Sequence, residues 1–165
     1  MPEAPIEKQG QQELMQHLPQ QGRVEWLSYR PEKRAPVKVV DEIEILEGGI
    51  CGDHYAGGSG RRSITLIQHE HLPAIAGFLH RDTVDPADLR RNIVVSGINL
   101  LALKDREFKI GTVILKMTGL CHPCSRMDDV LGEGGYNAMR GHGGINACVV
   151  RPGHIRLLDE VAIIP

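Results

Sequence analysis

The sequence predicts a mainly β (α+β) domain, in which a closed or partly open β-barrel carries a few short helices. Short segments with apolar runs or apolar–polar alternation recur from residue 22 onward, and such segments are typical of β-strands. Few helical segments lie between them, without the regular β-α-β alternation of a parallel α/β fold. Residues 1–21 are rich in Gln and Pro and show little periodicity. We therefore expect a flexible N-terminal arm over 1–21 and one domain over 22–165.

The first half of the domain contains both strand and helix patterns. Strands are predicted over three segments: 23–29, 37–46 and 63–68. Residues 69–80 place their apolar side chains at the three- and four-residue spacing of a helix. A short helix is predicted to run through Arg90, with Asp85 as its N-cap and Pro86 at its first position.

The second half is predicted to contain more strands than helices. Residues 92–97 form one strand, and 107–119 form two strands joined by a turn at Gly111. A helix is predicted over 125–131, ended by Gly132. Residues 145–165 have the pattern of a hairpin that turns at Pro152-Gly153, followed by a last strand.

Composition and charge exclude several classes of protein. Hydrophobic residues make up 41% of the 165 residues and charged residues 24%, which is typical of a globular domain. The formal net charge of −2 gives no reason to expect nucleic acid or an anionic membrane as a partner. No apolar run approaches the ~20 residues of a membrane span, and the first 22 residues do not resemble a signal peptide. We therefore expect a cytoplasmic protein whose thiols are reduced.

Two of the four cysteines, Cys121 and Cys124, lie close together in the segment TGLCHPCSRM. Such a pair can be a thiol–disulfide switch, half of a zinc site, the seat of one reactive thiolate, or two buried cysteines. Its position late in a β-rich chain disfavours a thioredoxin-type switch. Cys51 and His54, with C-x-x-H spacing, complete a Cys₃His zinc site as an alternative.

Glycine and arginine gather in three parts of the chain. These are 48–62, with Arg61 and Arg62; 89–95, with Arg91 and Asn92; and 139–146, with Arg140, His142, Gly143 and Gly144. Glycine lets a ligand approach backbone N–H groups, and arginine binds oxygen atoms in pairs. The three segments together predict a pocket for an anionic, phosphorylated ligand with a thiolate at its edge.

The order and spacing of several segments resemble the MOSC domain family, named after the C-terminal domain of molybdenum-cofactor sulfurase. The resemblance runs from about Arg23 to Ile164. It covers GDHYAG, RRSITLIQHEHL, LRRNIVVSGINLLALKDREFKIG, TGLCHPC and GHGGINACVVRPGHIRLLDEV. It implies a β-barrel of the kind also found in pyruvate kinase, with a few helices.

The same resemblance implies that the family's single essential cysteine is Cys124 and that the ligand is molybdenum cofactor (molybdopterin), with Cys124 as a molybdenum ligand. Thiolate is a soft metal ligand, and backbone dipoles at the start of the predicted helix stabilise it. Arg126 adds positive charge beside it. The arginine and glycine segments would hold the phosphate and the pterin. Four residues are possible auxiliary members of the site: Asp53, His54, Cys121 and His122.

Three functions are compatible with this resemblance. In the first, the protein is a molybdoenzyme that reduces N-hydroxylated small molecules with electrons from a separate electron-transfer protein. In the second, Cys124 carries sulfur as a persulfide received from a cysteine desulfurase, without molybdenum, for a metal–sulfur cluster or cofactor. The third is a non-catalytic carrier of molybdenum cofactor.

Overall fold

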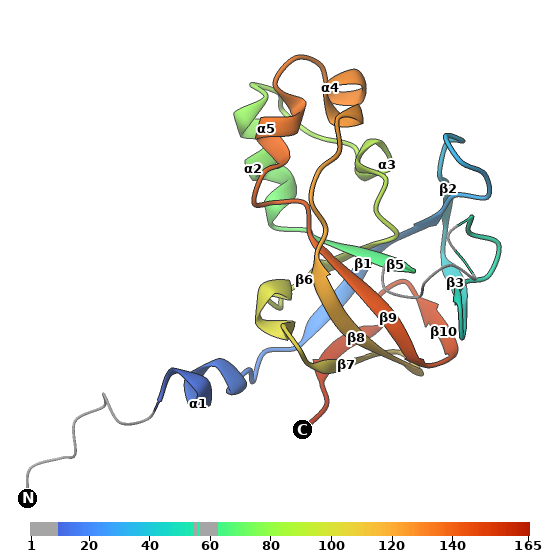
Figure 1. The fold of residues 1–165 in the computed structure, drawn as a ribbon, viewed down its shortest axis with the longest axis vertical. Coiled ribbons are helices and arrows are strands. Elements are labelled where there is room, and N and C mark those ends of the chain that lie inside the picture. The colour runs from blue at the N-terminus through green and yellow to red at the C-terminus, as the bar shows by residue number, and fades with distance from the viewer. Residues whose placement is uncertain (1–9, 55, 57–62) are drawn as a thin grey trace, which may run out of the picture.

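The computed structural model describes residues 10–54, 56 and 63–165, and its centre is a closed β-barrel (Figure 1). Seven strands follow one another around the barrel in the order β11-β7-β8-β9-β5-β6-β1, and β1 pairs with β11 to close it. Their bounds are β1 Gly22–Tyr29, β5 Ile64–Gln68, β6 Ile93–Ser96, β7 Glu107–Ile110, β8 Val113–Leu120, β9 Ile145–Arg151 and β11 Glu160–Ile163. The predicted fold class, a β-barrel with a few short helices, is confirmed.

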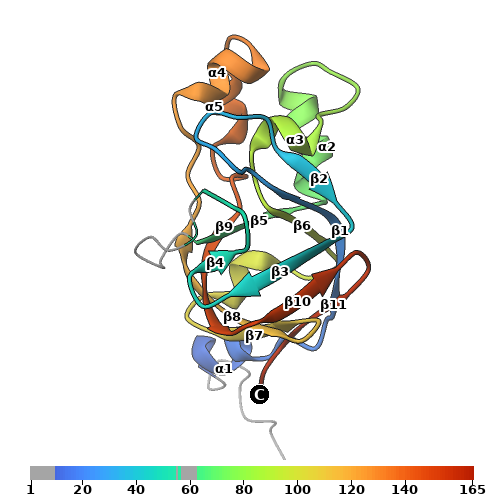
Figure 2. The ribbon, with the colours of Figure 1, turned by 90° about the vertical axis from the view of Figure 1, so that its right-hand side faces the viewer.

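Three further strands form a small sheet beside the barrel, with β3 (Glu42–Leu46) between β4 (Gly49–Ile50) and β10 (Gly153–Arg156) (Figure 2). A short β2 (Lys38–Val40) extends the main sheet from β1. The predicted hairpin at Pro152-Gly153 is wrong, because β10 pairs with β3. Both edges of β9 are occupied, by β8 and β5, so the chain after Pro152 has to leave that sheet.

Most neighbouring strands are antiparallel, but β5 and β6 are parallel. The chain between them forms α2 (His71–Phe78) and α3 (Pro86–Leu89). In α3 the Asp85 side chain accepts a hydrogen bond from the backbone N–H of Ala87, and Arg90 ends the helix in the left-handed conformation. This short helix was predicted from its N-cap and proline.

Two hydrophobic cores lie on opposite faces of the β5–β6 pair. Leu66 and Ile93 point into the barrel, where Phe108 is the largest fully buried side chain. Ile67 and Val94, one residue further along each strand, point outward and pack beneath the helices. Because successive strand residues face opposite sides, these two strands are buried on both faces, as parallel strands usually are.

The helices α2, α3, α4 (Arg126–Leu131) and α5 (Gly135–Met139) gather as a helical cap at one end of the barrel (Figures 1 and 2). Leu131 and Met139 are buried in the outer core together with side chains of α2. Gly132, with φ of 90°, ends α4 as predicted. The strand β4, the 3₁₀ helix η2 (Leu100–Leu103) and α5 were not predicted. Each is short, so its local periodicity is weak.

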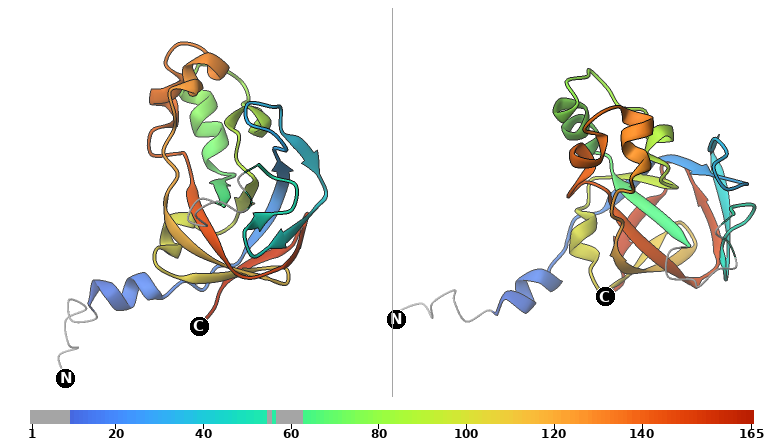
Figure 3. Two further views of the ribbon diagram at one scale, coloured as in Figure 1. Left: turned by 45° about the vertical axis from the view of Figure 1, so that its right-hand side comes forward. Right: turned by 45° about the horizontal axis from the view of Figure 1, so that its top comes forward.

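The helix α1 (Gln11–Gln16) projects away from the barrel (Figures 1 and 3). It buries none of its residues, and Leu14 and Met15 remain 57% and 65% exposed. Its attachment includes a hydrogen bond from Arg106 Nη1 to the carbonyl oxygen of Gln16 at 2.6 Å. In the part of the chain that the structure describes, no helix is long and apolar enough to cross a bilayer.

Deleting residues 1–16 is expected to change the melting temperature by less than about 4 °C, because α1 contributes no buried side chain and about 1 kcal/mol shifts a domain of this size by roughly 2–4 °C. The measurement is calorimetry on the full chain and the truncated chain. A larger fall would mean that the arm packs against the domain in solution.

Candidate functional site

A cavity of about 420 Å³ opens where the helical cap meets the barrel, and we call it the main cleft. Its walls come from the loop after β1, from β5, from the end of α3, from the β8–α4 connection and from β9. Six of the side chains that line it are cationic: Arg30, Lys33, Arg34, Arg90, Arg91 and Arg126. None of its described lining residues is Asp or Glu. This balance favours an anionic ligand.

The cysteine pair lies on the wall formed by the β8–α4 connection. Cys121 directly follows β8, is half-buried, and donates its backbone N–H to the carbonyl oxygen of Gly144 at 2.9 Å. Cys124 is exposed and lies two residues before the first residue of α4. Its carbonyl oxygen accepts a hydrogen bond from the N–H of Met127 at 3.0 Å. Neither thiol is in a disulfide, so the main cleft presents an accessible reduced sulfur beside its cations.

Beneath the cysteine pair, Arg91 is only 8% exposed. Its guanidinium donates three hydrogen bonds to backbone carbonyls: Nε to Gly143 at 2.7 Å, Nη1 to Leu89 at 3.0 Å and Nη2 to Cys121 at 3.5 Å. A buried charge needs such partners, because leaving water without them costs several kcal/mol. Arg91 therefore joins the end of α3, the cysteine segment and the glycine loop, and it contributes positive charge to the floor of the main cleft.

The glycines of that loop are required by close backbone contacts. A Cβ at Gly143 would lie 2.0 Å from the carbonyl oxygen of Cys121, and one at Gly144 would lie 1.9 Å from that of Leu66. Gly144 also has φ of 86°, in the left-handed region. Both glycines let the loop pack directly behind the cysteine segment.

Asn92 does not line the main cleft itself, but it holds Thr65, which does. Asn92 Oδ1 accepts hydrogen bonds from the backbone N–H and the hydroxyl of Thr65, each at 3.0 Å. Its Nδ2 donates to the carbonyl oxygen of Ser28 at 3.3 Å, which connects β1 to the same network. On the neighbouring strand β9, Asn146 is paired with Thr65, and its Nδ2 donates to the carbonyl oxygen of Leu120, the residue before Cys121.

Asp53 and His54 hold the backbone of Arg30 at the mouth of the main cleft. The buried Asp53 Oδ1 accepts a hydrogen bond from the Arg30 N–H at 2.8 Å, and His54 Nδ1 lies 3.3 Å from the Arg30 carbonyl oxygen. Cys51 and His54 do not join the cysteine pair in a metal site. Among the described residues there is no group of three or more His, Cys, Asp or Glu side chains that could hold a metal ion. The alternative zinc site is therefore not formed.

Besides Asn92, two of the predicted ligand-binding side chains do not line the main cleft, namely Arg140 and His142. Arg140 is exposed and its Nη1 lies 3.5 Å from Asn137 Oδ1. His142 packs on the outer side of the glycine loop, where its Nδ1 lies 3.2 Å from that of His71. Burial lowers the pKa of His71, and His142 lowers it further. The loop was predicted to bind through these side chains, but their contacts are with the helical cap.

The remaining predicted residues divide between the main cleft and the undescribed part of the chain. His122 and Arg126 line the main cleft. Arg61 and Arg62 lie outside the described residues. Sequence reasoning missed the loop after β1, which supplies Arg30, Lys33 and Arg34. A usable signal was present, because YRPEKRAP carries three cations within eight residues between two strand patterns.

Comparisons with known proteins agree with this geometry. The family model described as "MOSC domain" matches residues 53–162. The structure resembles that of the YuaD protein from Bacillus subtilis, with a TM-score of 0.80 and 23% identity over 89% of this chain and 98% of that one. No curated protein matched in a sequence search.

Two further solved structures share the fold. The YiiM protein from Escherichia coli has a TM-score of 0.67 and 19% identity, with 87% of this chain and 70% of that chain covered. For YiiM from Geobacillus stearothermophilus the TM-score is 0.71 and the identity 13%, with 87% and 75% covered. At these identities the likeness shows the fold alone. The family model begins at Asp53, so the match leaves out the cationic loop after β1.

Replacing Arg91 with Lys is expected to lower the free energy of unfolding by about 2 kcal/mol or more, because one ammonium group cannot replace a planar guanidinium bonded to three separate carbonyls. Arg140→Lys is the matched control on an exposed arginine and should stay within about 0.5 kcal/mol of wild type. Urea unfolding measures both. Equal effects of the two substitutions would contradict the role assigned to Arg91.

Two substitutions, Gly144→Ala and Gly141→Ala, distinguish how much close packing and how much backbone conformation contribute to stability. Both glycines have positive φ, 86° and 80°, but only the Cβ at position 144 would meet another atom within 4 Å. We expect about 1–2 kcal/mol of destabilisation from Gly141→Ala and at least about 3 kcal/mol from Gly144→Ala. Similar losses in the two unfolding curves would show that the glycine loop is not in close contact with β5.

Proposed function

The chain belongs to the MOSC domain family, and we propose that it is a molybdoenzyme that binds molybdenum cofactor in the main cleft, with Cys124 as a metal ligand, and reduces N-hydroxylated compounds. The family is associated with molybdenum cofactor binding. The observation that carries the proposal is the exposed thiol of Cys124 in a cavity that six cations line.

The residues of the main cleft fit this cofactor in two respects. Molybdenum accepts soft sulfur donors, and Cys124 presents one at the wall of the cavity. The cofactor carries a terminal phosphate, for which guanidinium groups and the ammonium of Lys33 are suitable partners. Thr65 and Asn146 add hydrogen-bonding groups on the barrel side.

When bound, the cofactor supplies a metal that exchanges two electrons with a substrate. Reduction of an N-hydroxyl compound consumes two electrons and two protons and yields the amine and water. His122 lines the main cleft between the two cysteines, and an imidazole ring can donate a proton through a ring N–H. It can deliver a proton to the departing hydroxyl oxygen of the substrate. The electrons would come from a separate electron-transfer protein.

Sulfur transfer is the second candidate function, and the presence of two thiols in one cleft favours it. In this scheme a cysteine desulfurase would donate sulfur to the exposed Cys124 as a persulfide, and Cys121 would lie nearby when that sulfur is passed on. A non-catalytic cofactor carrier would use the same residues. It would contain molybdenum without reducing a substrate.

Cys124→Ser is expected to lose bound molybdenum, because a serine hydroxyl is neither deprotonated nor soft at neutral pH. Cys121→Ser makes the same change of atom at the first residue of the β8–α4 connection, and it should retain most of the molybdenum. The measurement is molybdenum and pterin content per chain after production in cells that make the cofactor. Reductase assays on the loaded protein then separate the enzyme from the carrier.

Both substitutions should leave the melting temperature close to that of wild type, which removes misfolding as an explanation. Full molybdenum content in Cys124→Ser would contradict the proposal. If wild-type Cys124 carries labile sulfane sulfur and the protein never contains molybdenum, the sulfur-transfer function replaces the molybdoenzyme proposal.

A further inference from the structure

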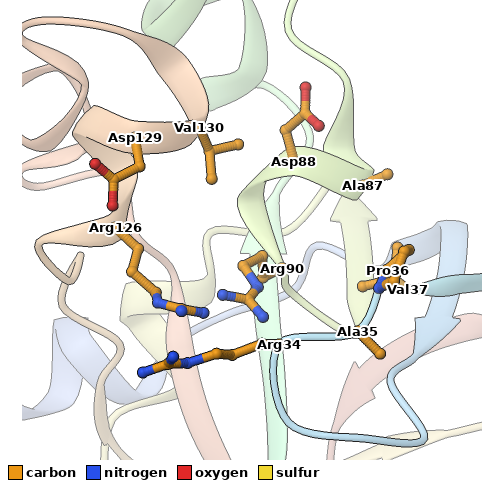
Figure 4. Close-up of a pocket in the computed structure, with 10 residues that line it drawn as sticks. All are labelled: Arg34, Ala35, Pro36, Val37, Ala87, Asp88, Arg90, Arg126, Asp129 and Val130. Carbon is orange, nitrogen blue, oxygen red and sulfur yellow. The ribbon is translucent and has the colours of Figure 1, made fainter.

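A second cavity of about 340 Å³ adjoins the main cleft, and we call it the side cavity. The two cavities share Arg34, Arg90 and Arg126 as a common wall. The rest of the side cavity is largely apolar and is lined by Ala35, Pro36, Val37, Ala87 and Val130 (Figure 4). A molecule in the side cavity would therefore lie beside whatever occupies the main cleft, separated from it by three arginines.

The three guanidinium groups come from three separate elements and point toward one another in Figure 4. Arg34 belongs to the loop after β1, Arg90 follows the last residue of α3, and Arg126 is the first residue of α4. Like charges that converge repel one another, and a bound anion removes that cost.

The backbone conformation at these arginines also favours a ligand-binding site. Arg34 and Arg90 have φ values of 67° and 61°, in the left-handed region that residues other than glycine rarely adopt. Backbone strain of this kind persists where the surrounding structure imposes it, and it is frequent at ligand-binding sites. At Arg90 this conformation ends α3, so the strain at Arg34 is the one that no helix end accounts for.

The side cavity also has two carboxylates, on its helical side. Asp88 on α3 and Asp129 on α4 are exposed. In Figure 4 the Asp88 carboxylate points away from the guanidinium groups, and the Asp129 carboxylate lies above the start of the Arg126 side chain. An anionic group entering the side cavity is therefore attracted to the arginines and repelled at the Asp88 end. This polarity would orient a ligand that has a single anionic end.

We propose that the side cavity binds the substrate and that this substrate is an organic oxyanion, a carboxylate or a phosphate ester, with an uncharged apolar body. Its oxyanion contacts Arg34, Arg90 and Arg126, and its body lies against the apolar wall. The inference rests on the proposed function, because the N-hydroxyl group of the substrate would have to lie near its oxyanion, at the arginine wall that borders the main cleft. The cofactor retains Arg30, Lys33 and Arg91 as cations of its own.

The test uses phenyl phosphate and benzoate as anionic probes, benzyl alcohol as the neutral probe of similar shape, and inorganic phosphate as the anion without a body. Binding to the full chain is followed by amide and methyl NMR shifts. Phenyl phosphate or benzoate should shift Ala35, Val37, Ala87 and Val130. The better of the two should bind about tenfold more tightly than benzyl alcohol, because it adds charge-assisted hydrogen bonds. It should also bind more tightly than inorganic phosphate.

Arg34→Gln and Arg126→Gln should each weaken the better anionic probe by about tenfold, whereas Arg140→Gln, on an exposed arginine outside both cavities, should not. Melting temperatures establish that the variants fold. The inference is overturned by any of three results: equal binding of benzyl alcohol, equal binding of inorganic phosphate, or unchanged affinity in both arginine variants. Anion-induced shifts confined to Thr65 and Asn146 would also overturn it, because they would place the probe in the main cleft.

Failure of this inference can be distinguished from failure of the proposed function. Cys124 lies outside the side cavity, so the Cys124→Ser variant should bind the anionic probe as tightly as wild type while it loses molybdenum. Normal molybdenum content in wild type together with no probe binding would overturn the inference about the side cavity and leave the proposed function intact. Probe binding at the side cavity in a protein that never takes up molybdenum or pterin would overturn the proposed function alone.

Discussion

The buried guanidinium of Arg91 is the interaction on which the geometry of the candidate site depends. It bonds to carbonyls of Leu89, Cys121 and Gly143, three segments that are distant in sequence. Since the charge is almost fully removed from water, the three carbonyls must remain in place. The position of Cys121 is thereby fixed from below, and Cys124 follows at the open side of the main cleft. Because Gly143 and Gly144 have no side chains, their loop packs directly against the carbonyl oxygens of Cys121 and Leu66 and helps to hold the cysteine segment in place.

The site occurs where it does because the barrel has one pair of strands buried on both faces. The outer faces of β5 and β6 need a cover of their own, and the helical cap provides it. The connections between barrel and cap then meet at one edge: the end of α3, the β8–α4 connection and the loop before β9. Connections of this kind can vary in side chain without disturbing either core, so a rigid scaffold can hold reactive groups there.

Local signals predicted much of this structure, and contacts between distant segments account for the errors. Asp85 and Pro86 identified α3, and Gly132 identified the end of α4, because caps act within a few residues. The pairing of β10 with β3 depends on which sheet edges are already occupied, which no local pattern encodes. Arg140 and His142 stand beside glycine in the sequence, and only tertiary packing decides that their contacts are with the helical cap. The cations at 30–34 lie in a loop without glycine, so they belong to none of the glycine–arginine clusters that predicted the pocket.

The central claim is that the thiolate of Cys124 is a ligand of molybdenum in this cleft. X-ray absorption at the molybdenum edge of the loaded wild-type protein tests it most directly, because sulfur and oxygen neighbours give different distances. The account predicts one sulfur ligand in addition to the dithiolene pair of the cofactor. A metal coordinated by sulfur from the dithiolene alone would contradict it.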